Sequence, residues 1–176
     1  MIQGSAGPVD LTPKPVSASR IVLAQIMQVA DANIAGNVHG GTIMKLVDNA
    51  AGLAAAKHAG GLAVTAVMDE MSFLQPVYLG DLVTLKASVN EAFTTSMEVG
   101  VRVESESLTT GRVTHTSSAY LVFVAVDEHG QPRKVPPLLA ETDEERQRQR
   151  EAALRRQARL ERKEAIERAR SRERSS

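Results

Sequence analysis

The chain contains no cysteine and no tryptophan, and its aromatic side chains are limited to three phenylalanines and two tyrosines. The absence of cysteine excludes disulfides, zinc–thiolate sites and thiol catalysis. Because so few aromatic rings are available to stack on bases, we predict no nucleic-acid partner.

Long apolar segments are also missing. The longest apolar run covers residues 119–126 and is eight residues long, too short to cross a bilayer. Residues 1–20 lack the apolar segment of a signal peptide. We therefore predict no membrane association and a cytoplasmic location.

Two common kinds of catalytic site find no support in the sequence. There is no G-x-S-x-G motif, which argues against a serine hydrolase of the nucleophile-elbow type. The four histidines, at 39, 58, 115 and 129, do not show the H-x-x-x-H or H-x-x-E-H spacing of metal sites. We predict no metal and no resident cofactor.

The informative part of the chain begins with residues 42–58. Apolar side chains recur there at three- and four-residue steps without a proline, which predicts a mostly buried helix. Nearly opposite Ile43 and Leu46, a stripe of small residues carries one acid, Asp48. Such a carboxylate either serves a ligand or has a structural role, for example beside Lys45, and periodicity alone does not separate these roles.

The loop before this helix, residues 36–41, reads G-N-V-H-G-G. Backbone N–H groups at a helix start lack intrahelical partners, and Gly40 and Gly41 have no side chains to block an approaching oxyanion. Such amides can bind an oxyanion or a phosphate, with the Gly41 amide as the candidate oxyanion donor and Gly40 beside the substrate, and the alternative is an ordinary glycine-rich turn into a helix. His39 either contacts substrate or has a structural role in the turn.

The segment 31–52, D-A-N-I-A-G-N-V-H-G-G-T-I-M-K-L-V-D-N-A-A-G, resembles the signature loop and helix of hotdog-fold acyl-CoA thioesterases, in particular the single-hotdog bacterial acyl-CoA hydrolases. Two further stretches are similar to that family, V-T-A-V-M-D-E-M-S-F-L-Q-P-V-Y-L-G-D at 64–81 and P-P-L-L-A-E-T-D-E-E-R at 136–146. The resemblance covers roughly residues 15–150, and it is weakest between 90 and 116.

The resemblance implies an active site made of an asparagine in the loop and an acid in the helix, which fall on Asn33 and Asp48. It also implies that Thr65 and Ala66 line the path of the pantetheine arm. The chain holds one copy of the motif with both residues, so the family arrangement requires a homodimer, with Asn33 of one subunit facing Asp48 of the other. A trimer of dimers is expected.

The implied reaction is hydrolysis of acyl-CoA to free CoA and a carboxylic (fatty) acid, with CoA as part of substrate and product. Asp48 would act as general base or as nucleophile, and sequence does not separate these routes. Asn33 would orient the water or the carbonyl. The alternative is a non-catalytic protein of the same fold that binds acyl-CoA as a sensor or scaffold.

The rest of the sequence predicts an α+β domain of the hotdog type, a curled antiparallel sheet around one long helix. Strands are expected at 20–28, 62–70, 82–89, 96–104 and 113–126. We divide the chain into a flexible segment (1–15), a thioesterase domain (16–140), and a charged C-terminal helix and tail (141–176).

The C-terminal part differs in kind from the domain. Residues 141–176 carry 12 basic and 9 acidic side chains with few large apolar ones, so we expect a solvated helix that buries little and has no catalytic role. Thr142 and Glu145 form a capping-box pattern at its start.

Arg102 and Arg112, both in the domain, are the cations that we consider for the CoA phosphates.

Overall fold

The computed structural model describes residues 10–174. Of the segment predicted to be flexible, residues 1–9 lie outside this range. Lys14–Pro15 form strand β1, which pairs in parallel with β7, Leu138–Leu139. A short 3-10 helix, Val16–Ser19, then leads into the sheet.

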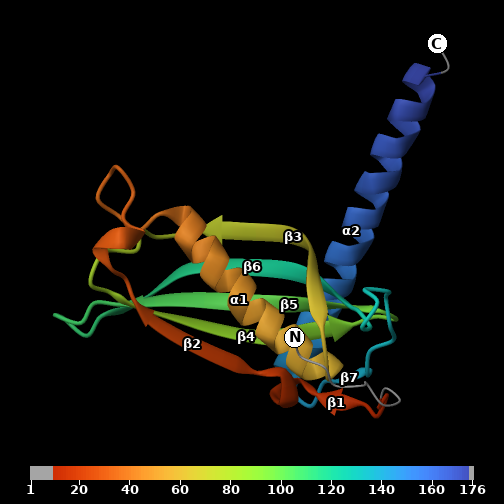
Figure 1. The fold of residues 1–176 in the computed structure, drawn as a ribbon, viewed down its shortest axis with the longest axis horizontal. Helices are drawn as coiled ribbons and strands as arrows, with labels where there is room; N and C mark the ends of the chain where they lie inside the picture. The colour runs from red at the N-terminus through yellow and green to blue at the C-terminus, as the bar shows by residue number, and fades with distance from the viewer. Residues whose placement is uncertain (1–9, 175–176) are drawn as a thin grey trace.

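Five antiparallel strands form the main sheet in the order β2-β4-β5-β6-β3 (Figure 1). Their bounds are Ile21–Ile26 for β2, Ala63–Phe73 for β3, Leu82–Ala92 for β4, Ser96–Glu106 for β5 and Val113–Ala125 for β6. The predicted hotdog fold is confirmed. Strands β2 and β3 form the two edges of the sheet, and edge strand β3 contacts α1.

Helix α1, Gly40–Ala59, crosses the inner face of the sheet. Its buried residues, among them Ile43, Val47 and Ala51, pack against the inward side chains of β4, β5 and β6. Strict alternation in β5 provides this contact, since every second residue from Met97 to Val103 faces the helix. The helix ends at Gly60, whose φ of 68° places it in the left-handed region that glycine tolerates.

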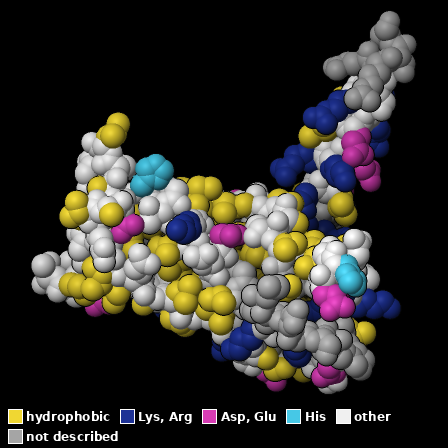
Figure 2. Space-filling model, in the orientation of Figure 1, with side chains coloured by type: hydrophobic (Ala, Val, Ile, Leu, Met, Phe, Trp, Pro, Cys, Tyr) yellow, Lys and Arg dark blue, Asp and Glu magenta, His cyan; other side chains and the backbone are white. Residues whose placement is uncertain are grey.

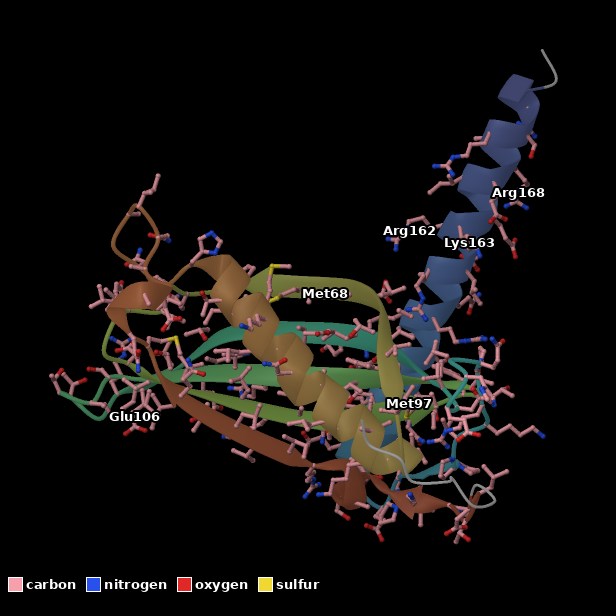
Figure 3. The ribbon with its side chains drawn as sticks, viewed as in Figure 1. Met68, Met97, Glu106, Arg162, Lys163 and Arg168 are labelled. Carbon is pink, nitrogen blue, oxygen red and sulfur yellow. The ribbon has the colours of Figure 1, made fainter. Side chains whose placement is uncertain are left out.

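Helix α2, Asp143–Arg174, begins as predicted with a capping box: the Glu145 N–H donates to Thr142 Oγ1 and the Thr142 N–H to the Glu145 carboxylate. Its first half packs on the outer face of the sheet, where Ala152 is fully buried. The expectation that this helix buries little was wrong for that half. The second half projects from the body, with Arg162, Lys163 and Arg168 along it (Figures 1 and 3).

Within residues 10–174, no helix is long and apolar enough to cross a membrane.

Candidate active site

One face of α1 is not covered by the sheet. Gly41, Lys45 and Leu53 are exposed along it, and Asp48 is partly exposed. The prediction of a mostly buried helix was therefore wrong for this face, because the sheet covers only one side of α1 within a single chain. Figure 2 shows hydrophobic side chains on this side of the molecule, with a few charged ones among them.

Asp48 has a specific partner on the neighbouring edge strand. The Thr65 hydroxyl donates a hydrogen bond of 2.7 Å to Asp48 Oδ1, and Oδ2 has no hydrogen bond or ion pair within the described residues. Lys45 forms no ion pair with Asp48 in the described part of the chain, so the structural alternative of a Lys45–Asp48 pair was wrong. Thr65 thus holds the carboxylate, and its role in lining the pantetheine path stays a prediction.

Thr65 reaches Asp48 at an irregular point of the sheet. The register between β3 and β6 shifts between Thr65 and Val67, so Ala66 has no directly paired residue on β6. A bulge of this kind changes the direction of nearby side chains. Ala66 is exposed on the same edge.

A mainly apolar hollow of about 600 Å³ opens beside Asp48 and Thr65. Side chains of β2, α1, β3 and β6 line it, including Leu23, Leu53, Val64 and Phe123. Gly52 also lies in its wall, and an added Cβ there would contact the Phe123 ring at 3.5 Å. An apolar hollow next to a carboxylate is suited to an acyl chain whose reacting carbonyl ends at that carboxylate.

Asn33 is fixed in a tight turn before α1. Its Oδ1 accepts hydrogen bonds from the Ala35 N–H at 2.8 Å and the Asn37 N–H at 3.2 Å. The side-chain NH₂ forms no hydrogen bond within residues 10–174. Because the oxygen is occupied by the turn, Asn33 presents a donor to the surroundings rather than an acceptor.

The start of α1 differs in detail from the expected oxyanion site. His39 is the N-cap, and its Nδ1 accepts the Gly41 N–H at 2.8 Å. This capping role explains why the helix begins at Gly40 rather than at 42. The Gly41 amide, predicted as oxyanion donor, is thus engaged by His39, whereas the Gly40 N–H makes no hydrogen bond within the described residues.

The structure brings Asn33 and Gly40 together in one hollow of about 330 Å³, which Phe73 and Pro76 also line. Asp48 and Thr65 line the other hollow, and no residue lines both. Eight residues of helix separate Gly40 from Asp48, a rise of about 12 Å. One thioester carbonyl therefore cannot contact both the helix start and the Asp48 region of the same chain.

Among residues 10–174, no group of three or more histidine, cysteine, aspartate or glutamate side chains is arranged to hold a metal ion.

Comparison with known proteins gives consistent results. The profile of the Thioesterase superfamily matches residues 35–112. An uncharacterized acyl-CoA thioester hydrolase of Bacillus subtilis is 38% identical over 127 residues, which cover 72% of this chain and 74% of that protein.

Solved structures share the fold as well as the sequence. An apo-hexameric acyl-CoA thioesterase is 37% identical with a TM-score of 0.83, over 86% of this chain and 97% of that one. An acyl-CoA hydrolase from Staphylococcus aureus, in complex with butyryl coenzyme A, coenzyme A and coenzyme A disulfide, is 33% identical with a TM-score of 0.81, over 89% and 95%. Further structures of that hydrolase carry alanine in place of an asparagine, an aspartate or a threonine.

Proposed function

The chain belongs to the hotdog-fold acyl-CoA thioesterases, and we propose that it hydrolyses acyl-CoA in a site built by two copies of the chain. Asp48, held by Thr65, acts from one copy. Asn33 and the amides at the start of α1 act from the other.

The observation that carries this assignment is the Thr65–Asp48 hydrogen bond at the mouth of an apolar hollow. The spacing of the residues replaced in the Staphylococcus aureus hydrolase supports it. There the asparagine lies 15 residues before the aspartate and the threonine 17 residues after it. Asn33, Asp48 and Thr65 have the same two separations.

The geometry supports two separate roles at the thioester carbonyl, hydrogen-bond donation to the oxyanion and activation or delivery of the nucleophile. The Asn33 NH₂ and the Gly40 N–H are donors without partners in the described chain, so both can donate a hydrogen bond to the oxyanion. The Gly41 N–H joins them if His39 turns away and the substrate oxygen replaces His39 Nδ1. Asp48 Oδ2 is free to take a proton from water or to attack the carbonyl itself.

A second copy of the chain fits the open face of α1. Strand β3 is an unpaired edge, and exposed apolar side chains lie on it and next to it, among them Val64, Met44 and Leu53. An exposed edge with apolar neighbours favours association. A two-fold axis beside β3 would place the start of each α1 near Asp48 of the other copy, forming two equivalent sites.

Turnover tests the chemistry. CoA release from acetyl-, medium- and long-chain acyl-CoA is followed with a thiol-reactive dye for the wild type, Asp48→Asn and the control Glu128→Gln, which removes a carboxylate from an exposed turn away from the site. Loss of a general base lowers kcat by about 10²- to 10⁴-fold, so we expect this loss in Asp48→Asn alone. Turnover at the wild-type rate in a folded Asp48→Asn protein would refute the role of Asp48.

Mixing variants tests the shared site. Asn33→Ala and Asp48→Ala chains are each expected to be nearly inactive, but a mixed dimer of the two contains one site with an intact Asn33 and an intact Asp48. Activity should return to about one working site per mixed dimer after the chains are dissociated and reassociated together. If mixed dimers form and remain inactive, each chain carries its own complete site.

Single turnover in ¹⁸O-labelled water separates the two roles of Asp48. As a general base, Asp48 removes a proton from water, and the label goes directly into the carboxylic acid. As a nucleophile, Asp48 displaces the CoA thiolate to give an anhydride. Water that attacks the Asp48 carbonyl carbon leaves the label on the protein, whereas water that attacks the acyl carbon places it in the acid, so label on the protein identifies the nucleophilic route.

The assembly beyond the dimer is a further part of the proposal. A trimer of dimers is supported by neighbours whose structures are described as hexameric. The cytoplasmic location stays a prediction.

A further inference from the structure

Helix α2 crosses the outer face of the sheet and continues beyond it. It contacts β4 first, then Arg155 lies over the Tyr120 ring of β6, and Arg159 pairs with Asp69 of β3. Because β3 is an edge strand, α2 has reached the end of the sheet at this ion pair. Residues 163–174, which we call the arm, project past the edge (Figure 1).

The side of α2 that packs on the sheet continues into the arm. At about 100° per residue, Ala152, Arg155 and Arg159 lie on one side of the helix. Lys163 and Ile166 extend this stripe by the next steps of four and three residues. Both are exposed, by 72% for the Lys163 side chain and 46% for Ile166. The arm therefore has a sheet-facing side but no sheet of its own chain beneath it.

An irregularity of β3 places two acids on the outer face of this edge. The register with β6 shifts just before Glu70, and Asp69 is the residue inside the shift. Glu70 lies opposite Tyr120, whose ring faces α2, so the bulge directs both acids to the side of α2. Asp69 is bound by Arg159 of the same chain. Glu70 is exposed and has no hydrogen bond or ion pair within residues 10–174.

A second copy at the β3 edge would meet both the arm and Glu70. A two-fold axis beside β3 continues the sheet into the second copy, so each arm passes over the outer face of the other chain. Lys163 lies about 6 Å along the helix past Arg159, and neighbouring strands are about 4.8 Å apart. Lys163 is therefore at the distance of the partner's edge strand, and Ile166 is one strand further.

We propose that the arm is an interaction surface for a second copy of this chain. Asp69 binds α2 of its own chain, Glu70 binds Lys163 of the other copy, and Ile166 packs on the outer face of that copy. The two arms are exchanged reciprocally and add a contact to the pairing of the β3 edges. The inference rests on the dimer of the proposed function. Its alternative is a solvated arm, with Glu70 as a charge that blocks unwanted pairing of the edge.

Subunit exchange measures how tightly the two copies associate. The chain has no cysteine, so Glu128→Cys in an exposed turn takes a donor or an acceptor fluorophore, and energy transfer is followed after mixing. A chain that ends at Arg162 keeps both ion pairs to Asp69 and lacks the arm. It should exchange at least about tenfold faster, the effect of one lost charged hydrogen bond.

Point variants in the arm test the stripe itself. Ile166→Asp should also accelerate exchange, because it places a charge on the packed side. Ala165→Asp, the matched control, adds the same charge to the neighbouring exposed position outside the stripe and should leave the wild-type rate. Equal rates for these two variants, or a wild-type rate in the shortened chain, would overturn the proposal.

Glu70→Lys then identifies the partner of the arm. In the full chain it should accelerate exchange about tenfold, and in the chain that ends at Arg162 it should add nothing, since its partner is already absent. A wild-type rate for Glu70→Lys in the full chain would assign Glu70 the solvated role and overturn its pairing. An equal acceleration in both chains would do the same, because Glu70 would then contact the edge strand instead.

Cross-linking tests the position of the arm without substrate. A Glu70→Cys chain and a size-tagged Lys163→Cys chain each carry one cysteine, so a disulfide between them joins two copies. It should form on mixing, whereas Ala165→Cys in place of Lys163→Cys should give none. Disulfides in a protein that hydrolyses no thioester would refute the proposed function and keep the arm. Wild-type turnover without these disulfides would refute the arm and keep the function.

Discussion

The two faces of the sheet are covered by helices in different ways. On the inner face, α1 packs through small and branched apolar side chains and leaves its opposite face uncovered. On the outer face, α2 is held by arginines: Arg155 donates to both carboxylate oxygens of the buried Glu98 and lies 3.7 Å from the centre of the Tyr120 ring, and Arg159 pairs with Asp69. The outer face is covered by α2 of the same chain, whereas the helix on the inner face keeps one of its own faces uncovered.

Because of this difference, the residues expected to set the free energy of unfolding and those expected to set kcat lie on opposite faces of the sheet. The outer ion pairs join α2 to the sheet and lie on the far side from Asp48. Burial works against the charged form of Arg155, but the hydrogen bonds and negative charge of Glu98 outweigh it and raise the pKa of Arg155. Changes on the outer face should therefore alter the free energy of unfolding, and changes on the open face of α1 should alter kcat.

The largest effect on stability is expected from Arg155→Met. This change leaves the Glu98 carboxylate buried without its charged partner, with only the Asn90 amide still donating to it, and the loss of the charged partner typically costs about 3–5 kcal/mol. Urea unfolding should show the loss, and kcat of the folded fraction should be unchanged. Arg170→Met removes the same charge from the exposed half of α2 and should change the free energy of unfolding by about 0.5 kcal/mol or less.

A compensating change sharpens this prediction. Adding Glu98→Met to Arg155→Met removes the buried negative charge and should recover most of the lost stability, less the cost of the Asn90 amide that loses its acceptor. If the double variant is as unstable as Arg155→Met, the loss comes from the packing of the arginine on Tyr120 instead.

On the open face, Thr65→Val should have the opposite profile. It removes the hydroxyl that positions Asp48 Oδ1 and keeps a similar shape, so kcat should fall about tenfold with little change in stability. Thr65→Ser retains the hydroxyl and should recover most of the rate. Steady-state kinetics and urea unfolding of both variants check this, and wild-type kcat in Thr65→Val would exclude the positioning role.

The smallest effect concerns His58, which is buried in the last turn of α1. Burial lowers the pKa of His58, the hydrogen bond to the Pro136 carbonyl opposes the shift, and the charge of Lys14 adds to it. The unfolded chain therefore binds a proton near pH 6.5 while the folded chain does not. Stability should be highest above this pH and should decrease as the pH falls from it toward the lowered pKa.

Urea unfolding at several pH values around and below 6.5 measures this slope. His58→Gln, whose side-chain amide can still donate to Pro136, should flatten it. The exposed His129→Gln should leave the slope at the wild-type value, and a slope that persists in His58→Gln would assign it to other groups.

The elements that repeat a pattern were predictable from the sequence. Apolar residues alternate in β5 and recur at three- and four-residue steps in α1, because these side chains face the core. Both spacings can be read from the sequence, so the fold and the position of the helix could be predicted. The motif also pointed to Asn33 and Asp48 as the site. These residues are close to the helix start in sequence, and their spacing is visible without a structure.

Contacts between distant elements were not predictable. Arg155 and Glu98 are 57 residues apart, and a glutamate between Met97 and Val99 has the pattern of a solvent-facing residue. The bond from Thr65 to Asp48 depends on the irregular register of β3, which no sequence pattern marked. The His39 cap on Gly41 is local, but histidine is not among the preferred N-cap residues, so the pattern gave no signal.

The separation of about 12 Å between Gly40 and Asp48 along α1 also determines how variants of the proposed dimer behave when they are expressed together with the wild-type chain. A chain that has lost only Asp48 still lends its Asn33 to a wild-type partner, so half of the activity of a mixed dimer survives. A chain that has lost both residues inactivates both sites of every dimer it enters. Such a double variant would be dominant over the wild-type allele, whereas each single variant would be close to recessive.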